Sequence, residues 1–359
     1  MKSAKLINGK IEIIDISKPI LNSPGAIIRV LGCGLCGSDI VKIKHATKQN
    51  EDSIVLGHEV VGVIEEINCK VKNHSVGEIV ALGHHYPCLD KNNCQFCKNE
   101  SYSMCPTFKK SNISPAGFSE YIKVDENHLR YTVYRMNPYL DNDEKAFLEP
   151  LSCCLRAVRR AGFEYEKNNS NSSALVIGLG SIGLLMLKAL RAFKVDAYGF
   201  DISQKRAILA AQHGFCYQDN KKYDTVFLTA GSDMAIKTAL EHVIDGGKII
   251  VFSSVKDDMA GFTNNEIYYR ELTVISSYSP SVDDIKLSAE LLNNKIVEVK
   301  GLSTFYSLDN LAKAIDDSIE GNVFKAYIEI WKWKLFVITH QMIYAMKKLK
   351  SLNYKKVKF

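Results

Sequence analysis

The sequence contains no apolar run of the roughly 18–20 residues that a membrane-spanning helix needs. Its first residues, MKSAKLINGKIEI, lack the apolar segment and small-residue cleavage site of a secretory signal. Proline is scarce, with 8 residues in 359, and the 22 glycines follow no regular repeat, which excludes a collagen-like or low-complexity chain. We therefore expect a cytoplasmic globular protein with no membrane span. At about 150 residues per domain, its length predicts two domains.

Acidic side chains are absent from residues 331–359, which contain eight lysines. Subtracting these eight charges from the net charge of +6 leaves −2 for the rest of the chain. A slightly acidic body gives no reason to expect a nucleic-acid partner. We interpret 331–359 as a basic C-terminal extension. It either packs as a helix with a solvated basic end, remains disordered, or forms a helix that contacts a membrane surface or an anionic partner.

Four of the ten cysteines are crowded into one short polar loop, at Cys88, Cys94, Cys97 and Cys105. Without a secretory signal, thiols or metal ligands are more plausible than disulfides. A loop rich in Asn and Lys cannot bury much apolar area, so a zinc ion held by four thiolates would stabilise it. The alternative is a reduced loop without metal.

The pattern of strands and helices changes near residue 173. Before it, short β-branched segments bounded by Gly, Asn or Pro predict a barrel-like or sandwich β domain. After it, strands and helices alternate, which implies parallel βαβ units. The predicted strands are 174–180, 196–200, 225–228, 248–252 and 326–330, and the predicted helices are 182–193, 203–213, 233–243, 282–293 and 308–319.

A glycine motif lies where the first of these strands meets a helix. Gly178 permits a tight turn, Gly180 allows backbone to approach a pyrophosphate, and Gly183 lets the helix pack closely on the strand. The helix N-terminus faces the anion. Because the context is strand, turn and helix, the motif predicts a dinucleotide site, the alternative being a non-binding α/β turn.

An acidic residue, Asp201, ends the next strand. Its carboxylate would accept hydrogen bonds from both ribose hydroxyls and repel a 2′-phosphate, which favours NAD over NADP. Lys205 and Arg206 follow closely and weaken this preference, because a cation tolerates the phosphate.

Candidate metal ligands lie in the β-rich region and at its junction with the α/β region. Cys36 and His58 offer a thiolate and an imidazole, which suit zinc. Glu149 lies where the β-rich and α/β regions meet and is a candidate third ligand. Pro150 disfavours the helical conformation for the residue before it, so we expect an extended backbone at Glu149.

Together these motifs resemble the zinc-dependent medium-chain dehydrogenase family, and within it the sorbitol (L-iditol 2-) dehydrogenase-like branch. The resemblance covers roughly residues 1–330. It rests on GLCGSD at 34–39, LGHE at 56–59, VGEIV at 76–80, the cysteine loop at 88–105, EPLSCC at 149–154, GLGSIG at 178–183, FDIS at 200–203, DGGKIIVF at 245–252 and RELTVISSYSPS at 270–281. It implies an α/β fold with a GroES-like, β-rich catalytic domain at 1–150 and 285–330. A Rossmann-type doubly wound parallel sheet would occupy 151–284.

The resemblance also implies roles in the catalytic site. Cys36 and His58 would be ligands of a catalytic zinc ion. Glu59 would lie beside the metal and exchange with water or substrate for coordination. Glu149 would bind zinc directly or hold its water. Ser38 would begin a proton relay.

Further residues match the cofactor and structural-metal positions of the family. The pyrophosphate turn and the ribose site would be formed by Gly178, Gly180, Ser181, Ile182, Gly183, Asp201 and Arg206, and the structural zinc site by Cys88, Cys94, Cys97 and Cys105. The chain departs from the family in two places. Five residues rather than two separate Cys88 from Cys94, and Val41 replaces a relay histidine, so protons would leave through water or His45.

The resemblance predicts hydride transfer between NAD and the secondary alcohol of a small-molecule polyol, sugar alcohol or cyclitol, by a homodimer or homotetramer. Three alternatives stay open. The first is a threonine, amino-alcohol or aminocyclitol dehydrogenase. The second is a non-catalytic relative that binds NAD or zinc. The third is a zinc-free, NADPH-dependent reductase of the same fold.

Overall fold

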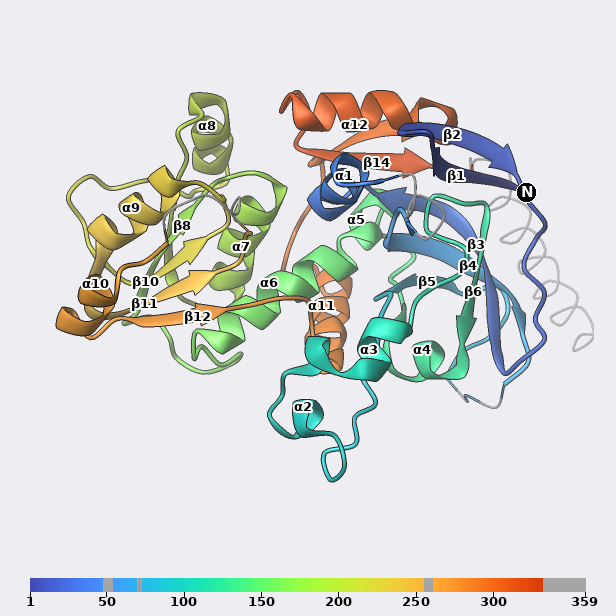
Figure 1. The fold of residues 1–359 in the computed structure, drawn as a ribbon, viewed down its shortest axis with the longest axis horizontal. Coiled ribbons are helices and arrows are strands. Elements are labelled where there is room, and N and C mark those ends of the chain that lie inside the picture. The colour runs from blue at the N-terminus through green and yellow to red at the C-terminus, as the bar shows by residue number, and fades with distance from the viewer. Residues whose placement is uncertain (48–53, 70, 72, 255–260, 332–359) are drawn as a thin grey trace, which may run out of the picture.

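The computed structural model describes residues 1–47, 54–69, 71, 73–254 and 261–331. In Figure 1 the chain forms two lobes. One is built around a parallel sheet, the other around a mostly antiparallel sheet, and helix α6 (Leu148–Arg160) runs from one to the other.

The parallel sheet has the strand order β12-β11-β10-β8-β9. Its strands are β8 (Ser173–Ile177), β9 (Asp196–Phe200), β10 (Tyr223–Leu228), β11 (Val243–Val251) and β12 (Thr273–Ser276). Successive buried residues alternate between the two faces: Val176 and Phe227 join the core on one face, and Leu175 and Val226 join the core on the other. Helices cover both faces, as a doubly wound sheet requires.

The second sheet has seven strands in the order β13-β14-β3-β4-β5-β7, with β6 also paired to β3. Its strands are β3 (Gly25–Gly34), β4 (Glu59–Ile67), β5 (Ile79–Leu82), β6 (Tyr121–Asp125), β7 (Val133–Arg135), β13 (Ser303–Ser307) and β14 (Lys325–Glu329). A separate hairpin pairs β1 (Lys2–Ile7) with β2 (Lys10–Asp15). Since β14 pairs with β3, a late segment of the chain completes the β-rich lobe.

Short helices connect the strands of the β-rich lobe and longer ones flank the parallel sheet. They are α1 (Gly37–Lys44), α2 (Gln95–Lys98), α3 (Pro106–Lys110), α4 (Glu126–Tyr131), α5 (Asn142–Ala146), α7 (Ser181–Ala192), α8 (Gln204–Gln212), α9 (Asp233–His242), α10 (Asn264–Tyr269), α11 (Val282–Asn293) and α12 (Leu311–Ile319), with 3₁₀ turns at η2 (Tyr102–Met104) and η3 (Leu308–Asn310).

The predicted alternation of strands and helices after residue 173 is confirmed. The strand at 196–200 and the helix at 282–293 have the predicted bounds. The helix predicted at 308–319 is divided into η3 and α12. The strand predicted to run to Gly180 ends at Ile177, because Gly178 adopts a positive φ of 95° and turns the chain.

Helix α6 is fixed by α11, which packs along it. Arg159 of α6 forms an ion pair with the buried Asp284 of α11, with 2.8 Å between Nη1 and Oδ1. The Ser288 hydroxyl donates to the Leu148 carbonyl over 2.7 Å. These contacts hold α6 at its first residue, Leu148, and in its last turn, at Arg159.

The basic extension predicted at 331–359 lies outside the described residues, except for Trp331. Within the described part of the chain, no helix is both long enough and apolar enough to cross a bilayer.

Asp125 caps helix α4 and joins it to the β-rich lobe. Its Oδ1 accepts from the His128 backbone N–H over 2.9 Å, and its Oδ2 accepts from the Tyr86 hydroxyl over 2.6 Å. Burial alone would raise the pKa of the Asp125 carboxyl. The hydrogen bonds from His128 and Tyr86 outweigh burial and hold that pKa below its ordinary value of 3.8.

We expect Asp125→Ala to lower the free energy of unfolding at pH 7 by about 1–2 kcal/mol, because the helix loses its cap. Asp125→Asn keeps an acceptor and should lose less. A carboxyl whose pKa is depressed by folding stabilises the protein above its unfolded pKa and stops doing so as the pH falls through its folded pKa. The stability difference between wild type and D125N should therefore shrink below about pH 4 in urea titrations. A difference that does not change with pH would contradict this.

Candidate functional site

Three of the predicted metal ligands meet where β3 ends and β4 begins, on adjacent interior strands of the seven-stranded sheet. Cys36 lies between β3 and α1, His58 directly precedes β4, and Glu59 is the first residue of β4. One ligand atom from each lies within 4.8 Å of the other two. The pairing of β3 with β4 explains this proximity, because it places Gly34 opposite Glu59 in the register.

The Glu59 carboxylate occupies space that only a glycine at position 34 leaves free. A Cβ atom on Gly34 would lie 2.0 Å from Glu59 Oε2. Glu59 forms a buried ion pair with Lys325 of β14, and the Lys325 ammonium also donates to the Leu35 carbonyl over 3.1 Å. Glu59 Oε1 is buried and accepts no hydrogen bond from the described residues.

Asp39 is a fully buried carboxylate that links the segments carrying Cys36 and His58. It accepts from the Cys36 N–H over 3.2 Å and from the Gly57 N–H over 3.0 Å. Its Oδ1 lies 3.4 Å from His58 Nδ1. Burial would raise the pKa of this carboxyl, but His58 outweighs burial and lowers it. A carboxylate against the ring of a ligand histidine fixes the orientation of that ring.

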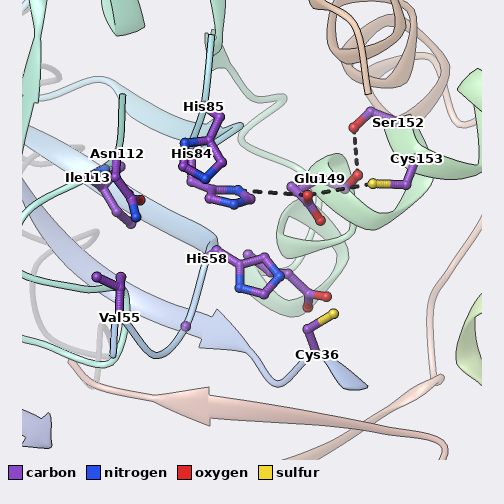
Figure 2. Close-up of polar contacts among 12 residues, drawn as sticks. Cys36, Val55, His58, His84, His85, Asn112, Ile113, Glu149, Ser152 and Cys153 are labelled. Carbon is purple, nitrogen blue, oxygen red and sulfur yellow. Dashed lines mark hydrogen bonds and ion pairs between the residues drawn. The ribbon is translucent and has the colours of Figure 1, made fainter. Parts of the chain in front are cut away.

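Glu149 approaches the same site from the first turn of α6, but it is not one of the three clustered ligands. Figure 2 shows its carboxylate between His84 and Cys153. Its Oε1 lies 3.8 Å from His84 Nδ1 and 3.6 Å from Cys153 Sγ. Burial raises the pKa of the Glu149 carboxyl, and the neighbouring His58 opposes this shift.

The predicted extended backbone at Glu149 is wrong. Glu149 and Pro150 both lie in the first turn of α6. A proline is tolerated there because the first N–H groups of a helix have no intrahelical partner. Because α6 begins at Leu148, Glu149 is part of the helix and its backbone is fixed by it.

Ser38 lies exposed in the first turn of α1, two residues from Cys36. Val41 is half exposed on the same helix, and His45 is its C-cap residue. A proton relay through Ser38 or His45 stays a prediction.

The four cysteines of the loop at 88–105 lie close together, although five residues separate Cys88 from Cys94. All four sulfur atoms lie within 4.8 Å of one another, and Sγ of Cys88 and Cys97 are 3.6 Å apart. All ten cysteines of the chain are free thiols. The loop rests on α6, since Arg156 donates to the Glu100 carbonyl and lies 5.5 Å from the Tyr102 ring.

The glycine motif forms the predicted turn between β8 and α7. A Cβ at Gly178 would lie 2.7 Å from Ala230, and one at Gly183 would lie 1.8 Å from the Gly178 carbonyl. Gly180 is the N-cap of α7, and a Cβ there would meet no atom within 4 Å. Ser181 and Ile182 form the first turn of α7, beside this open position.

Asp201 lies under the glycine turn at the end of β9. Its Oδ2 accepts from the Leu179 N–H over 2.6 Å and its Oδ1 accepts from the Ser203 N–H over 2.7 Å. Arg206 Nη1 lies 3.7 Å from Oδ2. The carboxylate is therefore fixed at the strand end, where the ribose of a dinucleotide lies in this type of fold.

Both candidate metal groups fit zinc. A thiolate, an imidazole and a carboxylate are the donor set of catalytic zinc sites, and four thiolates are that of structural sites. The buried Glu59 Oε1, which lacks a hydrogen-bond partner in the described residues, needs a cation or a donor.

The sequence signals for these residues differed. Asp39 belongs to the GLCGSD motif but was not assigned a role there. Cys153 belongs to the EPLSCC motif and contacts Glu149 one turn away on α6, but that motif gives it no role. Lys325 and His84 carry no interpretable signal in the sequence, because contacts between distant segments bring them to the site.

Comparison with known proteins agrees with this geometry. Residues 23–133 match the alcohol dehydrogenase GroES-like domain family. The chain is 26% identical to D-arabitol-phosphate dehydrogenase of Enterococcus avium over 340 residues, covering 88% of this chain and 93% of that protein. It is 26% identical to sorbitol dehydrogenase of Bacillus subtilis (strain 168) over 350 residues, covering 89% and 94%. Galactitol-1-phosphate dehydrogenase from Escherichia coli has the same fold, with a TM-score of 0.78 at 23% identity, covering 92% of this chain and all of that one.

Residues 23–133 thus carry the GroES-like domain of alcohol dehydrogenases, and over most of its length the chain is similar to zinc-type dehydrogenases of the sorbitol dehydrogenase-like branch. It is an oxidoreductase that acts on CH–OH groups with zinc and a nicotinamide dinucleotide.

We expect Gly34→Ala to displace the Glu59 carboxylate, because the new Cβ would occupy its place. The zinc content should fall by about one ion per chain, since the catalytic site holds one ion. Elemental analysis of purified protein measures this. Gly37→Ala is the matched control, because a Cβ at Gly37 meets no atom within 4 Å. Equal zinc contents in wild type and G34A would show that Glu59 is not needed to hold the metal.

Proposed function

We propose that the protein transfers hydride between NAD and a secondary alcohol group of a polyol, sugar alcohol or cyclitol. The observation that carries this proposal is the cluster of Cys36, His58 and Glu59 with the second carboxylate, Glu149, beside it. A site walled by carboxylates and imidazoles suits a substrate with several hydroxyl groups better than a simple alkyl chain. The curated relatives named for sorbitol and arabitol phosphate point the same way.

In this proposal Cys36, His58 and Glu59 would hold the catalytic zinc ion, which when bound polarises the alcohol oxygen and lowers the pKa of the hydroxyl. Asp39 keeps the His58 ring in place, and Lys325 balances the charge of Glu59. Glu149 would hold a substrate hydroxyl or a water molecule. Ser38 would pass the proton outward.

The cofactor would lie along the parallel sheet. Its pyrophosphate would rest on the turn from Gly178 to Gly183, with Ser181 and Ile182 at the helix start. Asp201 and Arg206 would hold the adenosine ribose. The nicotinamide ring would accept the hydride, and the protein would orient the two reactants.

The proposal includes the organisation of the chain. Residues 1–150 and 285–330 would form the zinc-bearing catalytic domain, and 151–284 the dinucleotide-binding domain. The thiolates of Cys88, Cys94, Cys97 and Cys105 would hold a structural zinc ion. We further propose a homodimer or homotetramer that works in the cytoplasm, where the free thiols would stay reduced.

A substrate panel tests the proposal on protein of measured zinc content. We expect NAD reduction with at least one of sorbitol, xylitol, galactitol and myo-inositol, and little with ethanol or 1-butanol. Removing zinc with a chelator should abolish turnover, and adding zinc back should restore it. Activity with primary alcohols or threonine alone would overturn the polyol assignment, and full activity without zinc would overturn the metal's role.

A second prediction concerns cofactor preference. Asp201→Asn keeps one oxygen, which can accept from either the Leu179 or the Ser203 amide but not from both, and it removes the charge that repels a 2′-phosphate. We expect the ratio of kcat/KM for NAD over NADP to fall about tenfold or more, equivalent to roughly 1.4 kcal/mol.

The matched control for this variant is Asp224→Asn. Asp224 also accepts a backbone N–H, that of Ser173 over 2.7 Å, but near the opposite ends of the strands. It should leave the ratio unchanged. If D201N and D224N behave alike, Asp201 is a structural residue only.

A further inference from the structure

A second imidazole, that of His84, lies beside His58 and Glu149 in the candidate site but is not one of the three clustered metal ligands. Its ring centroid lies 4.7 Å from that of His58, and its Nδ1 lies 3.8 Å from Glu149 Oε1. In Figure 2 its ring is directed toward Glu149 from the β-rich lobe. The His84 side chain is 16% exposed, whereas those of His58 and Glu149 are 6% exposed. It is therefore the more accessible group beside the metal cluster.

The backbone holds His84 firmly in this position. The preceding Gly83 donates to the Thr132 carbonyl over 3.0 Å and packs so closely that a Cβ would lie 2.6 Å from Ile285. The His84 carbonyl is joined to His128 Nε2 over 3.1 Å. The ring is thus presented to the site by a fixed main chain.

The His84 ring nitrogens have no hydrogen-bond partner among the described residues. Glu149 Oε1 lies 3.8 Å from His84 Nδ1, which is beyond hydrogen-bond distance. One oxygen atom at the usual ~2.8 Å from each group can bridge them. Such an oxygen would accept from the imidazole N–H and donate its own hydrogen to the carboxylate.

A hydroxyl next to the reacting alcohol group is the ligand that fits this bridge. A monohydroxy alcohol has one oxygen, which the metal site uses, and it would leave His84 and Glu149 facing an apolar chain. Unpaired polar groups in a closed site cost free energy, so such a site discriminates against substrates that lack the second hydroxyl.

We propose that His84 is a specificity-determining residue that, together with Glu149, binds the hydroxyl adjacent to the carbinol carbon being oxidised. The site thereby selects vicinal diols within the class of secondary alcohols. This inference rests on the proposed polyol function and names the part of the substrate that the site recognises.

The test compares two substrates of equal carbon chain, 2,3-butanediol and 2-butanol, with saturating NAD and measured zinc content. His84→Phe keeps a ring against His58 and His85 but removes both nitrogens. We expect wild type to prefer the diol. H84F should lower the ratio of the two kcat/KM values about tenfold or more, chiefly by loss on the diol.

His85→Phe is the matched control. The His85 ring lies 4.1 Å from that of His84, but its Nδ1 contacts the Ser111 carbonyl instead of Glu149. H85F should change the ratio of the two kcat/KM values less than about threefold, which is well below the tenfold change expected for H84F.

A binding measurement accompanies the kinetics. In the presence of NADH, 2,3-butanediol should raise the Tm of wild type more than 2-butanol does, and H84F should lose this difference.

An unchanged ratio in zinc-replete H84F, or equal losses on both substrates, would overturn the inference while leaving the polyol function in place. So would a wild type that prefers 2-butanol. Failure of wild type on every diol and polyol would overturn the proposed function itself. If H84F does not fold, H84L, which also removes both nitrogens, makes the same comparison, and a chain that folds only with His84 would show a structural role and end the proposal.

Discussion

The arrangement of the metal ligands depends on one buried carboxylate. Asp39 has no exposed surface, and a buried charge is stable only when hydrogen bonds and an opposite charge compensate it. The groups that satisfy it are the backbone N–H of Cys36, the backbone N–H of Gly57 and the His58 ring. Pairing Asp39 therefore brings together the two loops that carry Cys36 and His58.

The opposite wall of the site depends on helix α6, whose position is fixed by contacts far from Glu149. Arg159 pairs with Asp284 of α11, and Arg156 contacts the four-cysteine loop. Because both arginines lie on the helix that carries Glu149, the loop and α11 support the carboxylate indirectly. A zinc ion in the four-cysteine loop would stabilise this support without touching the reacting groups.

The sequence predicted the features whose physics is local. Gly178 and Gly183 are required within a segment only six residues long, and Cys36 and His58 lie in short motifs next to strand ends. Lys325 and His84 could not be found in this way, because strand pairing and ring contacts bring them to the site from other segments. The Pro150 rule failed for a local reason: it disfavours helix for the preceding residue, but a first helical turn has free N–H groups and tolerates the proline.

The charges around the cluster explain why a divalent cation suits it. Asp39 and Glu59 are buried carboxylates, and a ligated Cys36 adds a thiolate. Lys325 is the buried cation paired with Glu59, and it has the Leu35 carbonyl as its other partner. Asp39 has the His58 ring and two N–H groups as partners and Glu59 has Lys325, so a Cys36 thiolate would add a negative charge that these groups do not balance, and unbalanced buried charge is costly. A zinc ion adds two positive charges at the point where the ligand atoms converge, so the same residues that orient the metal also require its charge.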